Sequence, residues 1–275
     1  MYALMTGATG GIGLEVLRGL VGAGAHVVIG CRDVARGAAC VAQLGARAAG
    51  QVRVQPLDLA SLVSVRELAR WTGGELPRLD VLINAAAVWS RQRRLTADGL
   101  ELTFGVNHVA HHALTLGVVP VLRKSPAARV VTVASGIHVR GQLAWDDLMQ
   151  ARGGFNGVKA YEQSKLANVM FALALARRLA GVLASSAVHP GIVKTNLTRE
   201  YPEMFRQTPP RSVIAAPVAA RAILRLALEP ALAKVTGRYL DRDRDQAPSK
   251  AALVVADQDR LWAATEALLA APAVR

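Results

Sequence analysis

The stretch TGATGGIG (residues 6–13) stands between a short apolar run, Tyr2–Thr6, and a run of helical periodicity at 12–23. Its glycines Gly7, Gly11 and Gly13 have the spacing GxxxGxG. Glycines let the backbone turn tightly and approach a pyrophosphate, whose charge then meets the amino end of the following helix. A glycine triplet alone indicates only a flexible turn. Its position between a first strand and a first helix favours a dinucleotide-binding loop.

The rest of the chain alternates short β-branched runs with helical periodicity, which is the pattern of βαβ units and a parallel sheet. Strands are expected at Tyr2–Thr6, His26–Cys31, Val52–Leu57, Leu79–Asn84, Arg129–Ser135, Ala184–His189 and Gly237–Leu240. Helices are expected at 12–23, 34–48, 61–72, 97–123, 158–180, 212–228 and 257–270. The sequence therefore predicts an α/β fold: one doubly wound (Rossmann) domain over 1–275, with about seven strands and helices on both faces.

Composition narrows the class of protein. The 33 Lys and Arg exceed the 20 Asp and Glu and give a formal net charge of +13, but the basic residues are scattered, with no basic stripe interleaved with aromatics. We therefore expect no nucleic-acid partner. The two cysteines, Cys31 and Cys40, form no disulfide framework and suit a reducing compartment. With no apolar run of membrane-spanning length, we expect a cytoplasmic protein with no membrane partner.

Three segments are expected to bound a substrate pocket: 88–95, 136–157 and 192–211. Two of them are long and irregular and follow strands at their carboxyl ends, where open α/β sheets bind ligands. Their apolar members Trp89, Leu143, Trp145, Met204 and Phe205 indicate an apolar substrate body. The arginines expected at the pocket mouth are Arg91, Arg93, Arg94 and Arg140.

The tip of the second predicted strand, Cys31-Arg32-Asp33, bears on the choice of cofactor. An acid at this tip would bind ribose hydroxyls, whereas the planar fork of Arg32 suits a 2′-phosphate. Asp33 directly precedes the next helix and is interpreted as its cap. Arg32 therefore favours NADP over NAD, and Asp33 remains the competing selector.

The stretch YEQSK (161–165) begins a long predicted helix and carries a tyrosine and a lysine four residues apart, on one helix face. A solvated lysine beside a half-exposed tyrosine would explain the pair without any function. Alternatively, the Lys165 ammonium lowers the pKa of the Tyr161 phenol and prepares it for proton transfer. His108, His111 and His112 lack an accompanying carboxylate or cysteine, so no metal site is predicted.

Several ordered motifs make the chain resemble the short-chain dehydrogenase/reductase superfamily over nearly all of residues 2–270. TGATGGIG is similar to the family's TGxxxGIG, YEQSK to its YxxxK, NAAA (84–87) to its NNAG, and HPGIVKT (189–195) to its PG motif. The runs DGLELTFGVNHVAHHALTL (98–116) and YEQSKLANVMFALALARRL (161–179) most resemble the retinol dehydrogenase-like branch, which CRD (31–33) also matches. NAAA loses one asparagine and the glycine of the motif, and His112 replaces a phenylalanine of that branch.

The resemblance implies a role for particular residues. Tyr161 and Lys165 would carry the proton and hold the nicotinamide ribose, Ser135 would orient the substrate oxygen, and Asn107 would anchor a water that leads protons away. The residues expected at the cofactor are Gly7, Gly11, Ile12, Gly13, Arg32, Asp58, Leu59, Asn84, Ala85, Tyr161, Lys165, Pro190, Gly191, Val193 and Thr195. The resemblance also makes a homodimer or homotetramer plausible, through helices 97–123 and 158–180.

Together these observations predict an NADP(H)-dependent oxidoreductase that interconverts a carbonyl and an alcohol on a bulky, mostly hydrophobic small molecule. Two alternatives remain open. One is a natural-product tailoring reductase acting on a double bond or an epoxide, and the other is a non-catalytic NADP-sensing protein on the same fold.

Overall fold

The computed structural model describes residues 1–271 and contains one eight-stranded sheet in the order β3-β2-β1-β4-β5-β6-β7-β8. β1 to β7 are parallel, and β8 pairs antiparallel with β7. The strands are β1 (Tyr2–Thr6), β2 (His26–Cys31), β3 (Val52–Pro56), β4 (Val81–Asn84), β5 (Arg129–Val133), β6 (Ala184–His189), β7 (Arg238–Asp241) and β8 (Arg244–Asp245). The predicted doubly wound sheet is confirmed, with a two-residue eighth strand that no sequence run signalled.

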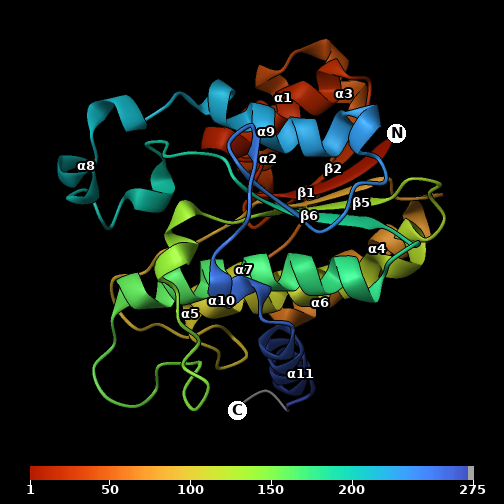
Figure 1. Cartoon of the computed structure of the whole chain (residues 1–275). Coiled ribbons are helices and arrows are strands. Elements are labelled where there is room, and N and C mark those ends of the chain that lie inside the picture. The colour runs from red at the N-terminus through yellow and green to blue at the C-terminus, as the bar shows by residue number, and fades with distance from the viewer. Residues whose placement is uncertain (272–275) are drawn as a thin grey trace.

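The helices cover the sheet on both faces (Figure 1). The α-helices are α1 (Gly11–Gly22), α2 (Val34–Gln43), α3 (Ala46–Gln51), α4 (Leu62–Glu75), α5 (Leu102–Phe104), α6 (Ala110–Leu122), α7 (Gly157–Arg178), α8 (Met204–Gln207), α9 (Ala216–Leu228), α10 (Lys250–Leu253) and α11 (Val255–Ala270). The short helices are η1 (Gly105–Val109), η2 (Gly136–Arg140), η3 (Asn196–Thr198), η4 (Pro210–Ser212) and η5 (Pro230–Leu232), of which η1 is a π-helix and the others are 3₁₀-helices.

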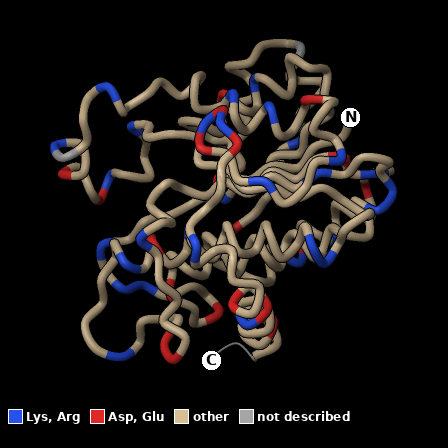
Figure 2. Tube along the Cα trace, viewed as in Figure 1, with Lys and Arg blue, Asp and Glu red and all other residues tan. Residues whose placement is uncertain are grey.

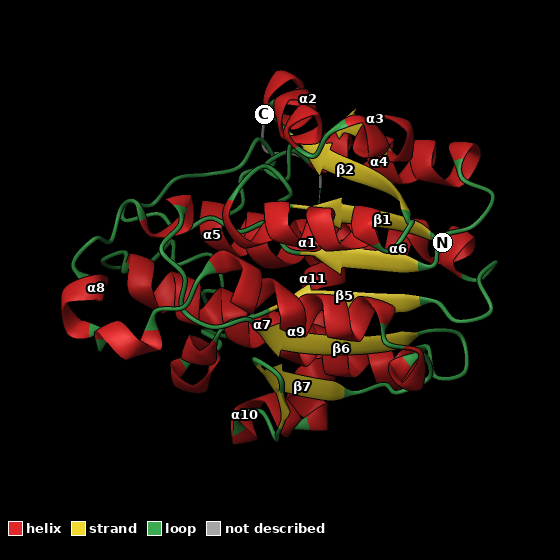
Figure 3. Cartoon of the chain, turned by 90° about the horizontal axis from the view of Figure 1, so that it is seen from above, coloured by secondary structure: helices red, strands yellow, loops and turns green. Residues whose placement is uncertain are grey.

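Apolar cores on both faces of the sheet hold these layers together. On one face, α1 and α9 pack on the sheet through residues such as Leu17 and Ile223. On the other face, α4, α6 and α7 pack through residues such as Leu68, Leu114 and Phe171. Because both faces are covered, the central strands are buried and read as continuous apolar runs. Figure 3 shows the strand arrowheads pointing toward the edge beyond which the segment with α8 projects.

Two predicted helices differ from the observed ones. The helix expected at 34–48 ends at Gln43, because Gly45 takes a left-handed conformation (φ 82°) and separates α2 from α3. The helix expected at 97–123 begins only after Glu101, whose carboxylate accepts hydrogen bonds from the backbone N–H of Thr103 and Phe104 at 2.8 Å each. Its first turns include the π-helix η1, a local irregularity that often marks a functional site.

Helix α11 forms an extra layer on the outer side of α7 (Figure 1). Trp262 stacks on Phe171 of α7 at 5.8 Å between ring centroids, and the Arg178 guanidinium lies 4.6 Å from the Trp262 ring centroid. The Arg177 and Arg178 guanidinium groups also pair with Asp259 at 2.8 and 2.9 Å. The part of α7 under α11 is therefore occupied by the chain itself, and the association expected through this helix stays a prediction.

Charged residues are spread along the whole trace, with Lys and Arg interleaved with Asp and Glu (Figure 2). This agrees with the diffuse basic character expected from the sequence. None of the helices in residues 1–271 has the length and apolar character needed to cross a membrane.

Candidate active site

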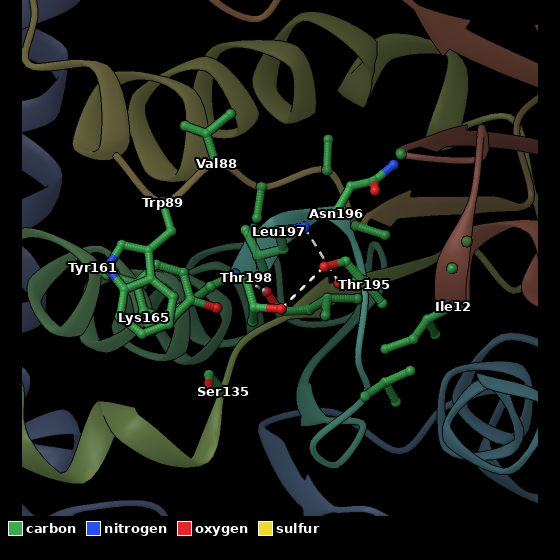
Figure 4. Close-up of a pocket in the computed structure, with 18 of the residues that line it drawn as sticks. Ile12, Val88, Trp89, Ser135, Tyr161, Lys165, Thr195, Asn196, Leu197 and Thr198 are labelled. Carbon is green, nitrogen blue, oxygen red and sulfur yellow. Dashed lines mark hydrogen bonds between the residues drawn. The ribbon is translucent and has the colours of Figure 1, made fainter. Parts of the chain in front are cut away.

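The carboxyl ends of the parallel strands border a cavity of about 1040 Å³. Residues predicted to bind the cofactor and residues predicted to act in catalysis both line it. In Figure 4, Ile12 and Tyr161 lie toward opposite ends of this cavity, with the segment Thr195–Thr198 between them. The predicted residues in its wall are Gly7, Gly11, Ile12, Gly13, Arg32, Asp58, Leu59, Ala85, Ser135, Tyr161, Lys165, Pro190, Gly191, Val193 and Thr195.

The glycine loop is a backbone surface that side chains would fill. Gly7 and Gly11 have φ of 76° and 54°, a region that only glycine adopts readily. A Cβ on Gly13 would lie 1.9 Å from the Gly7 carbonyl oxygen. Helix α1 begins at Gly11, so the unpaired N–H groups of its first turn are at the cavity. The loop therefore fits a pyrophosphate closely.

The residues that follow β4 are hydrogen-bonded to Thr6, at the start of the glycine loop. The Thr6 hydroxyl accepts hydrogen bonds from the backbone N–H of Ala85 and Ala86 at 3.0 Å each. It therefore donates its own proton to Nε2 of His111 at 2.9 Å. Asn84 turns toward α6, where its Nδ2 donates to the Thr115 hydroxyl at 2.9 Å. Asn84 thus joins β4 to α6 in this structure, whereas Ala85 lines the cavity.

At the tip of β2, Asp33 caps α2 as predicted: its Oδ1 accepts a hydrogen bond from the Arg36 backbone N–H at 2.9 Å. Arg32 lines the cavity, and so does Arg36, which the sequence reasoning missed. A Cβ on Gly10 would lie 3.4 Å from a guanidinium nitrogen of Arg36, which places this cation over the glycine loop. The sequence did offer a signal for Arg36, because it follows Arg32 by four residues at the start of the predicted helix.

The residues predicted to transfer the proton come from the end of β5 and from α7. Ser135 follows β5 and begins η2, while Tyr161 and Lys165 lie one turn apart in α7. The Lys165 ammonium donates a hydrogen bond to the Val133 carbonyl oxygen at 3.1 Å and lies 5.5 Å from the Tyr161 ring centroid. Lys165 and Tyr161 are 2% and 6% exposed, so YEQSK does not begin a solvated surface turn.

Burial shifts the pKa values of both side chains. Loss of solvent raises the pKa of the Tyr161 phenol above its usual value, and a hydrogen bond with the nearby Ser135 hydroxyl opposes that rise. Burial lowers the pKa of the Lys165 ammonium to about 8. In the protein alone the net shift of the phenol pKa is therefore upward, because desolvation is the largest effect, and the lowering of this pKa by Lys165 stays a prediction.

Asn107 lies in the π-helix η1 and uses its side chain to fix the wall of the cavity. Its Oδ1 accepts from the Val88 backbone N–H at 2.8 Å, and its Nδ2 donates to the Val88 carbonyl and to the Ser164 hydroxyl, both at 3.0 Å. Its main-chain carbonyl accepts a hydrogen bond from Nδ1 of His111 at 3.1 Å. The water-anchoring role implied by the resemblance stays a prediction.

The His111 ring connects Asn107 to Thr6, and burial lowers its pKa to about 4, which keeps the ring neutral. His108 has a different partner, since its Nε2 lies 3.0 Å from the Thr265 hydroxyl of α11. Within residues 1–271, no group of three or more His, Cys, Asp or Glu is placed to hold a metal ion.

Only some residues of the three predicted pocket segments line the cavity. Val88, Trp89, Ile137, Leu197 and Met204 line the cavity, and Arg140 lies at its wall. Phe205 does not take part in the wall that the described residues form.

One further expectation about these segments is wrong. Leu143 and Trp145 pack instead against the core under α7, and the Arg260 guanidinium covers the Trp145 ring at 4.3 Å. The arginines at 91–94 are not themselves in the cavity wall: Arg91 and Arg94 pair with acids of the 192–211 segment, and Arg93 donates to the Met149 carbonyl, so their place at the mouth stays a prediction.

Comparisons with known proteins agree with this geometry. Residues 1–205 match the family model described as short chain dehydrogenase. Human retinol dehydrogenase 14 is 35% identical in an alignment that covers 97% of this chain and 85% of that protein. A crystal structure of an uncharacterised protein from Mycobacterium Paratuberculosis is 32% identical, with a TM-score of 0.80 and coverage of 100% of this chain and 95% of that one. The Pseudomonas aeruginosa RhlG/NADP active-site complex is 27% identical, with a TM-score of 0.70 and coverage of 88% and 94%.

The chain therefore belongs to the short-chain dehydrogenase family, whose members are oxidoreductases that use a nicotinamide dinucleotide. Its likeness to the retinol dehydrogenases places it in the retinol dehydrogenase-like branch, as the sequence motifs predicted.

Proposed function

We propose that this protein is an NADP(H)-dependent oxidoreductase that interconverts a carbonyl and an alcohol on a bulky, mostly hydrophobic small molecule. The observation that carries the proposal is that Tyr161, Lys165 and Ser135 line the same cavity as the glycine loop. When bound, the nicotinamide supplies or accepts the hydride. The protein must then deliver a proton to the substrate oxygen or remove one from it.

The side chains at the cavity suit these tasks. The phenol of Tyr161 is the proton donor for reduction and, after ionisation, the acceptor for oxidation. The Ser135 hydroxyl donates a hydrogen bond that holds the substrate oxygen near this phenol. Lys165 places a positive charge beside the ring and stabilises the phenolate. Asn107 holds Val88 and Ser164 in place around the group.

The test is NADPH oxidation, followed by absorbance, with bulky ketones, aldehydes and quinones. Tyr161→Phe should abolish turnover while the dissociation constant for NADPH changes less than about 3-fold, because the ring is kept and only the hydroxyl group is lost. Full activity of Tyr161→Phe with a carbonyl substrate would refute the mechanism. Turnover of double bonds or epoxides without carbonyl reduction would favour the tailoring reductase, and NADPH binding without any turnover would favour the sensor.

The preference for NADP is part of the proposal and rests on Arg32 and Arg36. Both guanidinium groups are at the cavity end beyond the glycine loop, while Asp33 is engaged at the α2 amino terminus. Binding titrations should favour NADPH over NADH, and Arg32→Ala should remove most of that preference. Arg70→Ala, an exposed arginine of α4, is the matched control. Equally tight NADH binding by the wild-type protein would mean that Asp33, rather than Arg32, determines which cofactor binds.

The substrate class rests on the apolar wall formed by Val88, Trp89, Ile137, Leu197 and Met204. Human retinol dehydrogenase 14 is named for retinol, a long apolar alcohol, and retinal is therefore a suitable first probe. Efficient turnover confined to small hydrophilic carbonyls would contradict this part. The cytoplasmic location and the homodimer or homotetramer expected from the sequence remain predictions.

A further inference from the structure

Three aromatic rings and one guanidinium form a continuous stack at the substrate end of the cavity, and we call these four residues the ring stack. The Tyr161 and Trp89 ring centroids are 4.4 Å apart at an interplanar angle of 10°. Tyr201 covers the Trp89 ring at 4.2 Å and 22°, and the Arg91 guanidinium carbon lies 4.6 Å from the Tyr201 centroid. Figure 4 shows the Trp89 and Tyr161 rings one over the other. The ring stack thus joins α7 to the segments that follow β4 and β6.

Hydrogen bonds fix the ring stack in place. The Trp89 indole N–H donates to the Gly157 carbonyl at 3.0 Å, and the Tyr201 hydroxyl donates to the Ser90 carbonyl at 3.2 Å. A Cβ on Gly157 would lie 2.1 Å from the Tyr201 hydroxyl and 2.2 Å from the Ser90 carbonyl oxygen, so only glycine fits at this first position of α7. All three rings are at most 8% exposed.

The outer end of the ring stack is tied to the substrate segment 192–211 by charge. The Arg91 backbone N–H donates to the Glu200 carboxylate, and its Nε donates to the Glu200 carbonyl, both at 2.9 Å. Its guanidinium also pairs with Glu203. Arg91 therefore holds one acid on each side of the stacked Tyr201 in the sequence. The segment that closes the cavity is attached, through two rings, to the phenol that our proposed function makes the proton donor.

We propose that Trp89 and Tyr201 are positioning residues: the ring stack couples closure of segment 192–211 to the orientation of the Tyr161 ring. This inference rests on the proposed function only for its catalytic consequence. Trp89 covers one face of the phenol, so the Tyr161 ring cannot turn while Trp89 is itself held by Tyr201. When segment 192–211 lifts, Tyr201 leaves Trp89, one face of the indole loses its partner, and the phenol ring is released.

The coupling is tested first in the protein without substrate. Trypsin cuts after lysine and arginine, and mass spectrometry can follow its cleavage at Lys194, Arg199 and Arg206 within the segment. Tyr161→Leu, which removes the ring at the far end of the stack, should raise the cleavage rate about 3- to 10-fold, whereas the ring-retaining Tyr161→Phe should leave it unchanged. Arg91→Ala should also raise it, and the neighbouring Arg93→Ala serves as the matched control. An unchanged cleavage rate in Tyr161→Leu would overturn the coupling.

The second test concerns the positioning of the phenol. Stacked rings give a near-ultraviolet circular dichroism signal. The part of it that comes from the ring stack should be lost in Trp89→Leu and largely kept in Trp89→Phe, while the part from other pairs such as Trp262 and Phe171 remains in both. With NADPH and retinal, Trp89→Leu should lower kcat about 10- to 100-fold with little change in the KM for NADPH, and Trp89→Phe should restore most of it. A lost dichroism signal with unchanged kcat would refute the positioning role. If retinal is not reduced even by the wild type, the proposed substrate class fails, while the cleavage and dichroism results still decide whether the ring stack couples the segment to Tyr161.

Discussion

The two ends of the cavity differ in the atoms that form their walls. The dinucleotide end consists mainly of backbone, where Gly7, Gly11 and Gly13 leave room for a phosphate and α1 presents unpaired N–H groups. The substrate end consists of buried side chains, among them Tyr161 and Lys165, whose ionisation depends on their surroundings. A side chain added to a glycine should therefore disturb the backbone end most, whereas the side-chain end should respond most to changes of charge and of pH.

The largest expected effect concerns the backbone end. Gly13→Ala places a methyl group 1.9 Å from the Gly7 carbonyl oxygen, so the loop must shift. We expect loss of measurable NADPH binding and a lower unfolding midpoint. Gly22→Ala in the same helix is the matched control, because a Cβ there meets nothing within 4 Å; helix propensity should make it up to about 1 kcal/mol more stable with unchanged NADPH binding. Normal NADPH binding by Gly13→Ala would contradict a close-fitting backbone cradle.

The next effect concerns the side-chain end and its dependence on pH. The pKa of Lys165 is about 8 in the folded protein and 10.5 in the reference state. Between these values the unfolded chain binds more protons, so the Lys165 contribution makes stability rise with pH across this window. Below it both states carry the proton, and the full cost of burying the charged ammonium no longer changes with pH. The free energy of unfolding of the wild type, minus that of Lys165→Met, should increase by about 2 to 3 kcal/mol from pH 8 to pH 10.

Denaturant unfolding of both proteins at each pH measures this difference. The Tyr161 phenol, whose pKa is raised by burial, is present in both proteins and largely cancels from it. A difference that stays flat over this window would show that the Lys165 ammonium remains protonated in its buried position.

The smallest effect concerns Asp33, at the end of β2, and whether it only caps α2 or also binds the cofactor. Asp33→Ala removes the hydrogen bond to the Arg36 N–H and should cost about 1 kcal/mol of stability, the usual value for a lost helix cap. The preference for NADPH should be retained, because the arginines are kept. Asp146→Ala, an exposed carboxylate in the loop before α7, should change neither quantity. A marked loss of NADH affinity in Asp33→Ala would mean that Asp33 binds ribose as well.

Much of this protein follows from local sequence. The glycine spacing, the Tyr161–Lys165 pair and the Asp33 cap each depend on residues within about two helical turns, and the structure places all of them as predicted. The alternation of strands and helices likewise defined the parallel sheet, because hydrophobic periodicity and crossover connections constrain the topology strongly.

Other features depend on contacts between distant positions. Ser90 and Tyr201 are 111 positions apart, and Thr6 and His111 are 105 apart, so no local pattern brings Trp89 onto Tyr161 or links Thr6 to Asn107. The same holds for Leu143 and Trp145, which are apolar and stand in a predicted pocket segment but pack under α7, and for the phenol pKa, which is set by burial. The sequence by itself determined the glycine loop after β1 and the Tyr161–Lys165 pair on one face of α7, because these rest on local backbone geometry and helix spacing. Only the tertiary structure decided which side chains line the cavity and how strongly they ionise, because both depend on what the folded chain packs around them.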